Sequence, residues 1–171
     1  MKTQTILSIM HFLAWFVFIA LLIKAGAILT TYTISWFNEI AAEKMYFDLD
    51  LSMYKAYSSI HYSFIVFNKV VLIIAQAYVA LLMTDLLKGF NLKNPFNNST
   101  VRLMEKICFS ILVIWALSIL HNAYLKALEN AVGLSAEYLD GSYLLWSALV
   151  YVLAQVFKRG VEIQTENQYT I

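Results

Sequence analysis

Four long apolar runs divide the chain, and polar segments separate them. The runs cover residues 6–23, 70–87, 107–125 and 143–157. A helix needs about 20 largely apolar residues to cross the hydrocarbon of a bilayer, so each run predicts a membrane span once its flanking residues are included. We expect an all-α membrane protein, an antiparallel four-helix transmembrane bundle with spans at about 6–29, 60–87, 105–125 and 139–158.

The second run has one polar face. Lys69, Gln76, Ala80 and Thr84 recur at helical intervals, which predicts that this face packs against protein rather than lipid. Ala25 and Ala27 resemble a signal-peptidase site, but the first run is longer than a usual signal segment, so we expect a retained span. The 171 residues then form a single four-span membrane domain, 1–171, with a short polar tail at 159–171.

The segment at 30–59 is polar and aromatic. Its first part has helical spacing, whereas Phe47, Leu49, Leu51 and Met53 alternate with polar residues as a short strand would. Trp and Tyr prefer the membrane surface, so we expect this stretch to lie there as an extracytoplasmic interfacial segment between spans 1 and 2. After span 2, Asn98 or Ser99 is expected to cap a helix that begins near Thr100.

Charge predicts orientation and limits the partners. The chain is 61% hydrophobic and 13% charged, which is too apolar for an ordinary soluble domain. Its net charge of +1 argues against direct nucleic-acid binding, and the bilayer is the first partner expected. Basic residues cluster on one side of the predicted spans, so both termini should be cytoplasmic in a bacterial inner membrane. They are Lys2, Lys88, Lys93, Arg102, Lys106, Lys158 and Arg159.

A polar cluster is expected near the outer ends of the spans, because its members fall at a similar depth. They are Lys24, Lys69, His121, Asn122 and Asp140. One interpretation is a pocket for an anionic ligand or a lipid headgroup. The other is that the lysines extend to the interface and pair with nearby carboxylates, as charged residues near span ends usually do.

Deeper polar side chains are expected to hydrogen-bond between helices as a polar core of the bundle. These are Gln76, Thr84, Ser110, Ser118, Ser147 and Gln155. His11 is expected to hydrogen-bond within the bundle, and Cys108 to serve packing. The sequence has no zinc-protease, nucleophile-elbow or phosphate-loop motif, so we expect no enzyme, no cofactor and no metal site.

Two stretches of the chain carry a family resemblance. The first runs from Asn94, Pro95, Phe96 and Asn97 into Val101, Arg102 and Leu103. The second is the tail from Phe157 to Asn167, which includes Lys158, Arg159, Gly160, Glu162 and Glu166. Together they resemble an uncharacterised, YoaS-like family of small bacterial four-span membrane proteins. The chain departs from the family pattern at Gln168, where Asp is usual, and at Asn94, which often follows a glycine.

The resemblance implies a sensor or tether for a transcription factor, because members often occur beside a small helix-turn-helix regulator. Gly160 would bend a cytoplasmic extension of the last helix, and the connector and tail would form a surface for that partner. The competing interpretation is that Arg102 or Lys106 binds Glu162 or Glu166 and locks the inner helix ends. Regulation is therefore the first hypothesis. The alternatives are a small transporter or a lipid- or anion-binding protein, a subunit of a larger complex, and a homo-oligomer.

Overall fold

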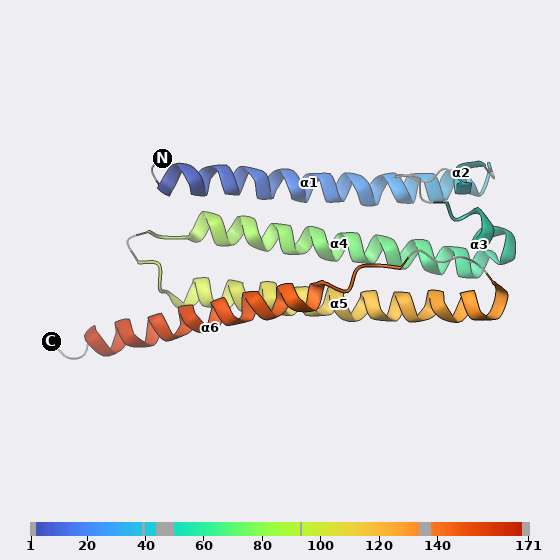
Figure 1. The fold of residues 1–171 in the computed structure, drawn as a ribbon. Helices are drawn as coiled ribbons and strands as arrows, with labels where there is room; N and C mark the ends of the chain where they lie inside the picture. The colour runs from blue at the N-terminus through green and yellow to red at the C-terminus, as the bar shows by residue number, and fades with distance from the viewer. Residues whose placement is uncertain (1–2, 39, 44–49, 93, 134–137, 169–171) are drawn as a thin grey trace. The chain divides into compact units, whose positions relative to one another are not determined.

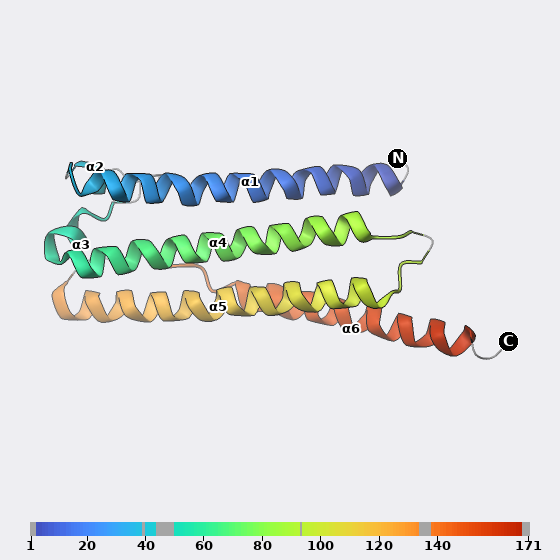
Figure 2. The same cartoon turned by 180° about the vertical axis from the view of Figure 1, so that it is seen from behind.

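The regular structure is helical throughout the part of the chain that is described. The computed structural model describes residues 3–38, 40–43, 50–92, 94–133 and 138–168. Its helices are drawn in Figure 1 and, from behind, in Figure 2. They are α1 (Thr3–Ser35), α2 (Ile40–Glu43), α3 (Ser52–Tyr57), α4 (Ser59–Gly89), α5 (Asn98–Val132) and α6 (Tyr143–Gln168). The all-α prediction is confirmed.

Four of the described helices are long and apolar enough to cross a membrane, judged by length and composition. They are α1, α4, α5 and α6, in the places that the sequence predicts. In the most apolar window of α4, 39% of the residues are buried by the rest of the chain, whereas none are buried in the window of α1. Of these helices, α4 is therefore the one that protein covers most.

The chain divides into two compact units, to which α1, α4 and α5 all contribute. The terminal unit comprises Met1–Phe18, Tyr78–Trp115 and Ser142–Ile171. The central unit comprises Ile19–Ala77 and Ala116–Gly141. Each unit has its own apolar core, and each is described in turn.

The core of the central unit forms around the first half of α4. Tyr62, Ile65 and Val66 are at most 2% exposed and provide its centre. Side chains from α1, from the α2–α3 segment and from α5 pack on them, including Ile28, Ala42, Leu51, Tyr54, Leu125 and Leu128. The short helices α2 and α3 thus cover one end of the α1–α4 hairpin with apolar side chains.

A buried hydrogen bond joins α1 to α4 in this core. The hydroxyl of Tyr62 lies 2.8 Å from Oγ of Ser35, and that serine donates to the carbonyl oxygen of Tyr32 at 2.7 Å. The ammonium of Lys55 donates to the carbonyl oxygen of Ser35. These bonds satisfy polar groups at the last turn of α1, where carbonyl groups have no partner within the helix.

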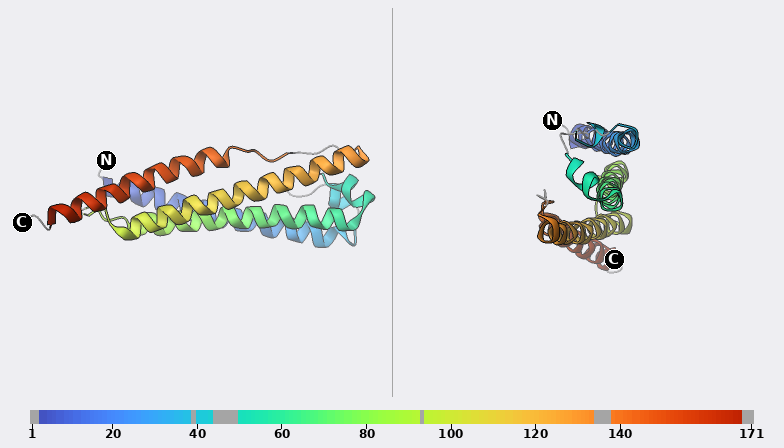
Figure 3. Two further views of the ribbon diagram at one scale, coloured as in Figure 1. Left: turned by 90° about the horizontal axis from the view of Figure 1, so that it is seen from below. Right: turned by 90° about the vertical axis from the view of Figure 1, so that its right-hand side faces the viewer.

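The core of the terminal unit forms where the second half of α4 meets the first half of α5. Leu82 packs against Ile107 and Ile111, and partly buried side chains of α6, Tyr143 and Val150, cover them. Figure 3 shows α6 alongside the first half of α5, with the opposite direction. Ala80 and Thr84, on the predicted polar face of α4, are buried, which confirms that this face packs against protein.

Two helix ends have clear causes. Oδ1 of Asn97 accepts from the backbone N–H of Thr100 at 2.8 Å, so Asn97 caps α5 and the helix begins at Asn98. The prediction of a cap at Asn98 or Ser99 was wrong by one or two residues. At its other end, α5 stops at Gly133, whose φ of 72° is the left-handed conformation that glycine adopts most readily.

Three further expectations need correction. Met53 lies in α3 and not in a strand, and just before this helix the carboxylate of Asp50 accepts from the N–H of Ser52 at 2.9 Å. Phe47 and Leu49, from the same predicted strand, lie outside the described residues. The last span begins at Tyr143, not near residue 139.

We predict that Tyr62→Phe lowers the free energy of unfolding by about 1 kcal/mol, because it removes a buried hydrogen bond and leaves Oγ of Ser35 with one partner fewer. For a chain of this size the midpoint of thermal unfolding should fall by roughly 2–4 °C. The measurement is thermal unfolding of the detergent-solubilised protein. Tyr78→Phe is the matched control on the same helix, because Tyr78 is 49% exposed. Equal shifts in both variants would contradict the prediction.

Candidate functional site

The connector between α4 and α5 packs against α6 in the terminal unit. The rings of Phe96 and Phe157 have centroids 5.4 Å apart, and those of Phe90 and Phe157 are 6.3 Å apart. Nε2 of Gln164 donates to Oδ1 of Asn94 at 3.1 Å. Each aromatic pair is expected to contribute about 0.5–1.5 kcal/mol beyond its buried area. The connector therefore forms one ordered surface with α6, which we call the connector–α6 platform. Its contacting residues are Phe90, Asn94 and Phe96 of the connector and Phe157 and Gln164 of α6.

Gly160 allows this packing. A Cβ at this position would lie 2.7 Å from Cε1 and 2.9 Å from Cγ of Phe96, closer than carbon atoms can approach. The prediction that Gly160 bends the chain was wrong, since α6 continues as a helix from Tyr143 to Gln168. The glycine is needed because the ring of Phe96 occupies the space of a side chain. Pro95 precedes that ring in the connector.

The ion pair of this surface lies within α6. The guanidinium of Arg159 donates to Glu162 at 2.8 Å, one helical turn away, and both side chains are about half exposed or more. Exposed pairs of this kind add little to stability, because solvent screens them. Glu162 thus pairs with its own helix rather than with Arg102 or Lys106. Aromatic rings and an amide hydrogen bond join the connector to α6. Glu166, on the following turn, also acts electrostatically on Arg159.

Three further basic side chains of this region are exposed besides Arg159: Arg102 and Lys106 on the first turns of α5, and Lys158 on α6. The charge of this surface is therefore available to a partner in solution. Exposed charges of this kind influence the rate and specificity of association more than its affinity.

A second contact joins α5 and α6 deeper in the terminal unit. Oγ of Ser147 donates to the carbonyl oxygen of Cys108 at 3.1 Å, and Sγ of Cys108 lies 3.3 Å from that hydroxyl. Ser147 therefore bonds between helices, as expected of the polar core. Thr84 and Ser110 instead donate to carbonyl groups of their own helices, at 2.7 Å to Leu81 and 2.8 Å to Lys106.

The remaining residues of the predicted polar core differ in exposure. Ser118 is buried at 2% exposed, whereas Gln76 and Gln155 are half-buried. His11 bonds as expected, since its Nδ1 lies 3.2 Å from the carbonyl oxygen of Thr84. This contact links α1 to α4 in the terminal unit.

The predicted outer cluster belongs to the central unit, but its members do not share one environment. The side chain of Asn122 bonds twice to the backbone of Leu139, at 2.8 and 2.9 Å, and so holds the loop that precedes α6. His121 is fully buried, and among the described residues neither of its ring nitrogens has a hydrogen-bond partner. Lys69 is half-buried and acts electrostatically on His121. Lys24 is half-buried and Asp140 is exposed.

A polar aromatic group in the central unit was missed by sequence reasoning. The rings of Tyr57 and His61 stack with centroids 5.4 Å apart, and Nδ1 of His61 bonds to the hydroxyl of Tyr124. Tyr57 ends α3 and His61 lies in the first turn of α4, so their closeness in sequence is a signal that could have paired them, although the extended Ser58 between them means that helical spacing does not. No such signal relates His61 to Tyr124, because the contact depends on how α4 packs against α5.

Charges in the two loops of the central unit are held locally. The hydroxyl of Tyr138 donates to the carboxylate of Glu129, and this bond raises the pKa of Tyr138. Bonds from the hydroxyl and the N–H of Ser52 lower the pKa of Asp50. Among the described residues, no three His, Cys, Asp or Glu side chains lie close enough together to hold a metal ion.

The fold defines the class of protein: with four apolar helices long enough to span a bilayer, this is a multi-pass membrane protein. The model of a family described as "Protein of unknown function (DUF2975)" matches residues 37–171, and the chain belongs to that family. The expected membership in an uncharacterised family is confirmed, whereas the narrower YoaS-like name is no part of the family's description. No curated protein and no solved structure matches the chain.

We predict that Gly160→Ala destabilises the protein, although alanine is the better helix former by about 1 kcal/mol. The added methyl group must displace the ring of Phe96 from Phe157. Gly26→Ala in α1 is the matched control, because nothing lies within 4 Å of a Cβ there. Thermal unfolding should show a lower midpoint for the first variant and an equal or higher one for the second.

Phe96→Ala provides a test of the cause. If the loss in Gly160→Ala comes from the clash, adding Gly160→Ala to Phe96→Ala should cost little or nothing further, because the obstructing ring is absent. Additive losses would show that Gly160 matters for another reason.

Proposed function

We propose that this protein is a regulatory or sensory membrane protein that couples an outer or bilayer signal to a cytoplasmic partner. The connector–α6 platform is its output surface, and a small helix-turn-helix transcription regulator is the class of partner that the family resemblance suggests. The observation that supports this most is the packing of Phe96 into the space above Gly160. It fixes the connector to α6, beside the exposed charges of α6 and of the first turns of α5. No catalytic role is proposed.

The proposed location is a bacterial inner membrane with both termini in the cytoplasm. The positions of lysine and arginine support this orientation, because Lys88, Lys93, Arg102 and Lys106 lie in or beside the connector in the sequence, and Lys158 and Arg159 lie in α6. Exposed apolar side chains support an interfacial position for the segment between α1 and α4. Phe37 is 91% exposed and Ile60 is 80% exposed, and both would be covered at a membrane surface.

The alternative function, a small transporter or a lipid- or anion-binding protein that uses the outer cluster, has less support. The amide of Asn122 is engaged by Leu139, and His121 is enclosed by its neighbours. The exposed apolar surface of α1 is compatible with lipid, with a second copy of the chain or with another subunit of a complex, so it does not decide between these roles.

We predict the orientation to be measurable with cysteine labelling. Cys108 is buried, so the unmodified protein should react little with a maleimide and serves as the unlabelled control. A membrane-impermeant maleimide applied to intact cells or spheroplasts should label Lys126→Cys, whereas Lys158→Cys should react only after the membrane is opened. Both lysines are exposed. The reverse pattern would place the platform outside and exclude a cytoplasmic partner.

We predict that the protein, tagged at its N-terminus and isolated from native membranes under mild conditions, retains a soluble DNA-binding protein. The double variant Arg102→Glu and Lys158→Glu reverses two exposed positive charges, one beside the platform on α5 and one on α6. It should reduce the retained amount severalfold, because an acidic surface of the partner that meets these positive charges would then be repelled. Lys126→Glu is the matched control in the central unit.

The comparison has two outcomes that count against the proposal. If the unmodified protein retains no DNA-binding protein, the regulatory function is wrong. If the double variant retains as much partner as the control, a partner exists but the connector–α6 platform is not its binding surface.

A further inference from the structure

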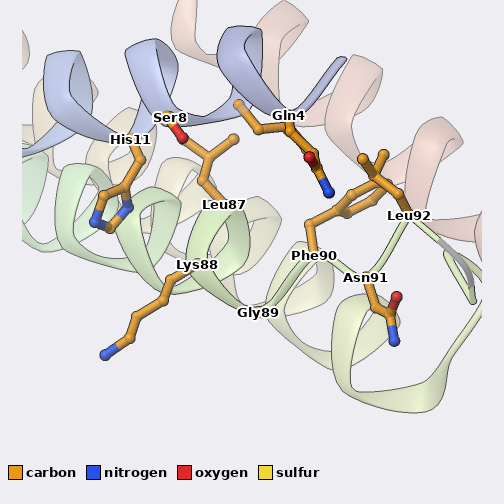
Figure 4. Close-up of a pocket in the computed structure, with 10 residues that line it drawn as sticks. Gln4, Ser8, His11, Leu87, Lys88, Gly89, Phe90, Asn91 and Leu92 are labelled. Carbon is orange, nitrogen blue, oxygen red and sulfur yellow. The ribbon is translucent and has the colours of Figure 1, made fainter. Parts of the chain in front are cut away.

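A pocket of about 770 Å³ lies in the terminal unit, between the first turns of α1 and the end of α4 (Figure 4). Gln4, Ser8 and His11 line it from α1, and Leu87, Phe90 and Leu92 line it from α4 and the connector. This volume is within the range of pockets that hold small molecules or parts of lipids. None of the functional assignments above uses it.

The lining mixes polar and apolar side chains on both sides. The α1 side carries the amide of Gln4, the hydroxyl of Ser8 and the imidazole of His11 beside Leu7, and the opposite side carries Leu87, Phe90 and Leu92 beside Lys88 and Asn91 (Figure 4). A ligand that satisfies both kinds of side chain is amphipathic. It has hydrogen-bonding groups at one end and hydrocarbon next to them.

Charge indicates the sign of the ligand. Lys88 belongs to the lining and is exposed, and no acidic side chain occurs among the described lining residues. The bond from Nδ1 of His11 to the carbonyl oxygen of Thr84 fixes that ring, so in the neutral imidazole Nε2 is an acceptor. The α1 side of the lining thus offers donors and one acceptor, and the ammonium of Lys88 lies at the edge of the pocket, extending away from Gln4 and Ser8 (Figure 4). This set suits a phosphate with a hydroxyl group nearby.

The position of the pocket agrees with this chemistry. It lies at the first turns of one membrane-spanning helix and at the last turn of another, so it is at the level of lipid headgroups rather than of the hydrocarbon. Gln4, Ser8 and Lys88 are exposed, and a lipid could enter from the side without a change in the fold.

We propose that this pocket binds the headgroup and upper chain of an anionic phospholipid. The site stands independently of the regulatory function, since binding can be measured on the purified protein alone. Phe90 belongs both to the pocket and to the ring contact with Phe157, so a bound lipid would touch the connector–α6 platform at this residue.

The test is native mass spectrometry of the purified full chain, equilibrated with equal amounts of phosphatidylglycerol and phosphatidylcholine that have the same acyl chains. We expect severalfold more phosphatidylglycerol to be retained. Lys88→Gln should reduce that preference about fivefold, the effect of one lysine next to anionic lipid. Lys106→Gln is the matched control, because this lysine is equally exposed and does not line the pocket.

A second variant tests the pocket itself. Ser8→Leu places a larger apolar side chain in the lining and should reduce the retention of both lipids, with thermal unfolding as the check that it folds. If this variant fails to fold, the comparison of Lys88→Gln with Lys106→Gln still tests whether Lys88 contributes to the preference for the anionic headgroup.

Three results would overturn the proposal. Equal retention of the two lipids would show that the headgroup is not recognised. Equal losses in Lys88→Gln and Lys106→Gln would show diffuse attraction to a basic surface. Displacement of the lipid by millimolar inorganic phosphate would show that the site takes a free anion and not a lipid.

Discussion

The packing of α4 on more than one side is the constraint on which the rest of the structure depends. In a bilayer, lipid chains are as apolar as leucine, so helices associate through close contact and hydrogen bonds rather than through the hydrophobic effect. α4 meets this need with small or hydroxylated side chains at buried positions, such as Ala77, Ala80 and Thr84. In the central unit, Tyr62 adds a hydroxyl bond to α1 within an otherwise apolar core. Because α4 supplies these surfaces, α1 can leave most of its own apolar side chains exposed.

In the terminal unit, side chains hold the connector in place, since few backbone hydrogen bonds occur among its described residues. The ring of Phe96 fixes it instead, and this requires that α6 have no side chain at Gly160. The helix accepts the intrinsic cost of a glycine in its interior, about 1 kcal/mol relative to alanine, in exchange for aromatic contacts of similar size. The hydrogen bond between Asn94 and Gln164, about one helical turn beyond Gly160, holds the connector to α6 at a second point.

Local sequence signals predicted the helices, and contacts between distant residues limited the prediction of the site. Apolar runs long enough to span a bilayer gave all four membrane helices, because length and hydropathy are properties of each segment alone. Gly160 was misread as a bend because a glycine in a helical pattern has several uses, and only the neighbouring ring of Phe96 distinguishes them. Similarly, equal depth along the spans suggested that Lys24, His121 and Asn122 meet. Depth does not say which way a side chain faces, and Asn122 in fact holds the backbone of Leu139.

Polar side chains therefore have different roles in the two units. In the central unit, Asn122, Ser35 and Tyr62 satisfy backbone groups or one another, which makes their contribution structural. In the terminal unit, the exposed side chains of Arg102, Lys158 and Lys88 have no such structural necessity, since an exposed charge adds little to stability. Charges that stabilise the fold only weakly, yet are held beside an ordered connector, are best explained by what they bind. This reasoning favours the terminal unit, rather than the outer polar cluster, as the part of the molecule that recognises other molecules.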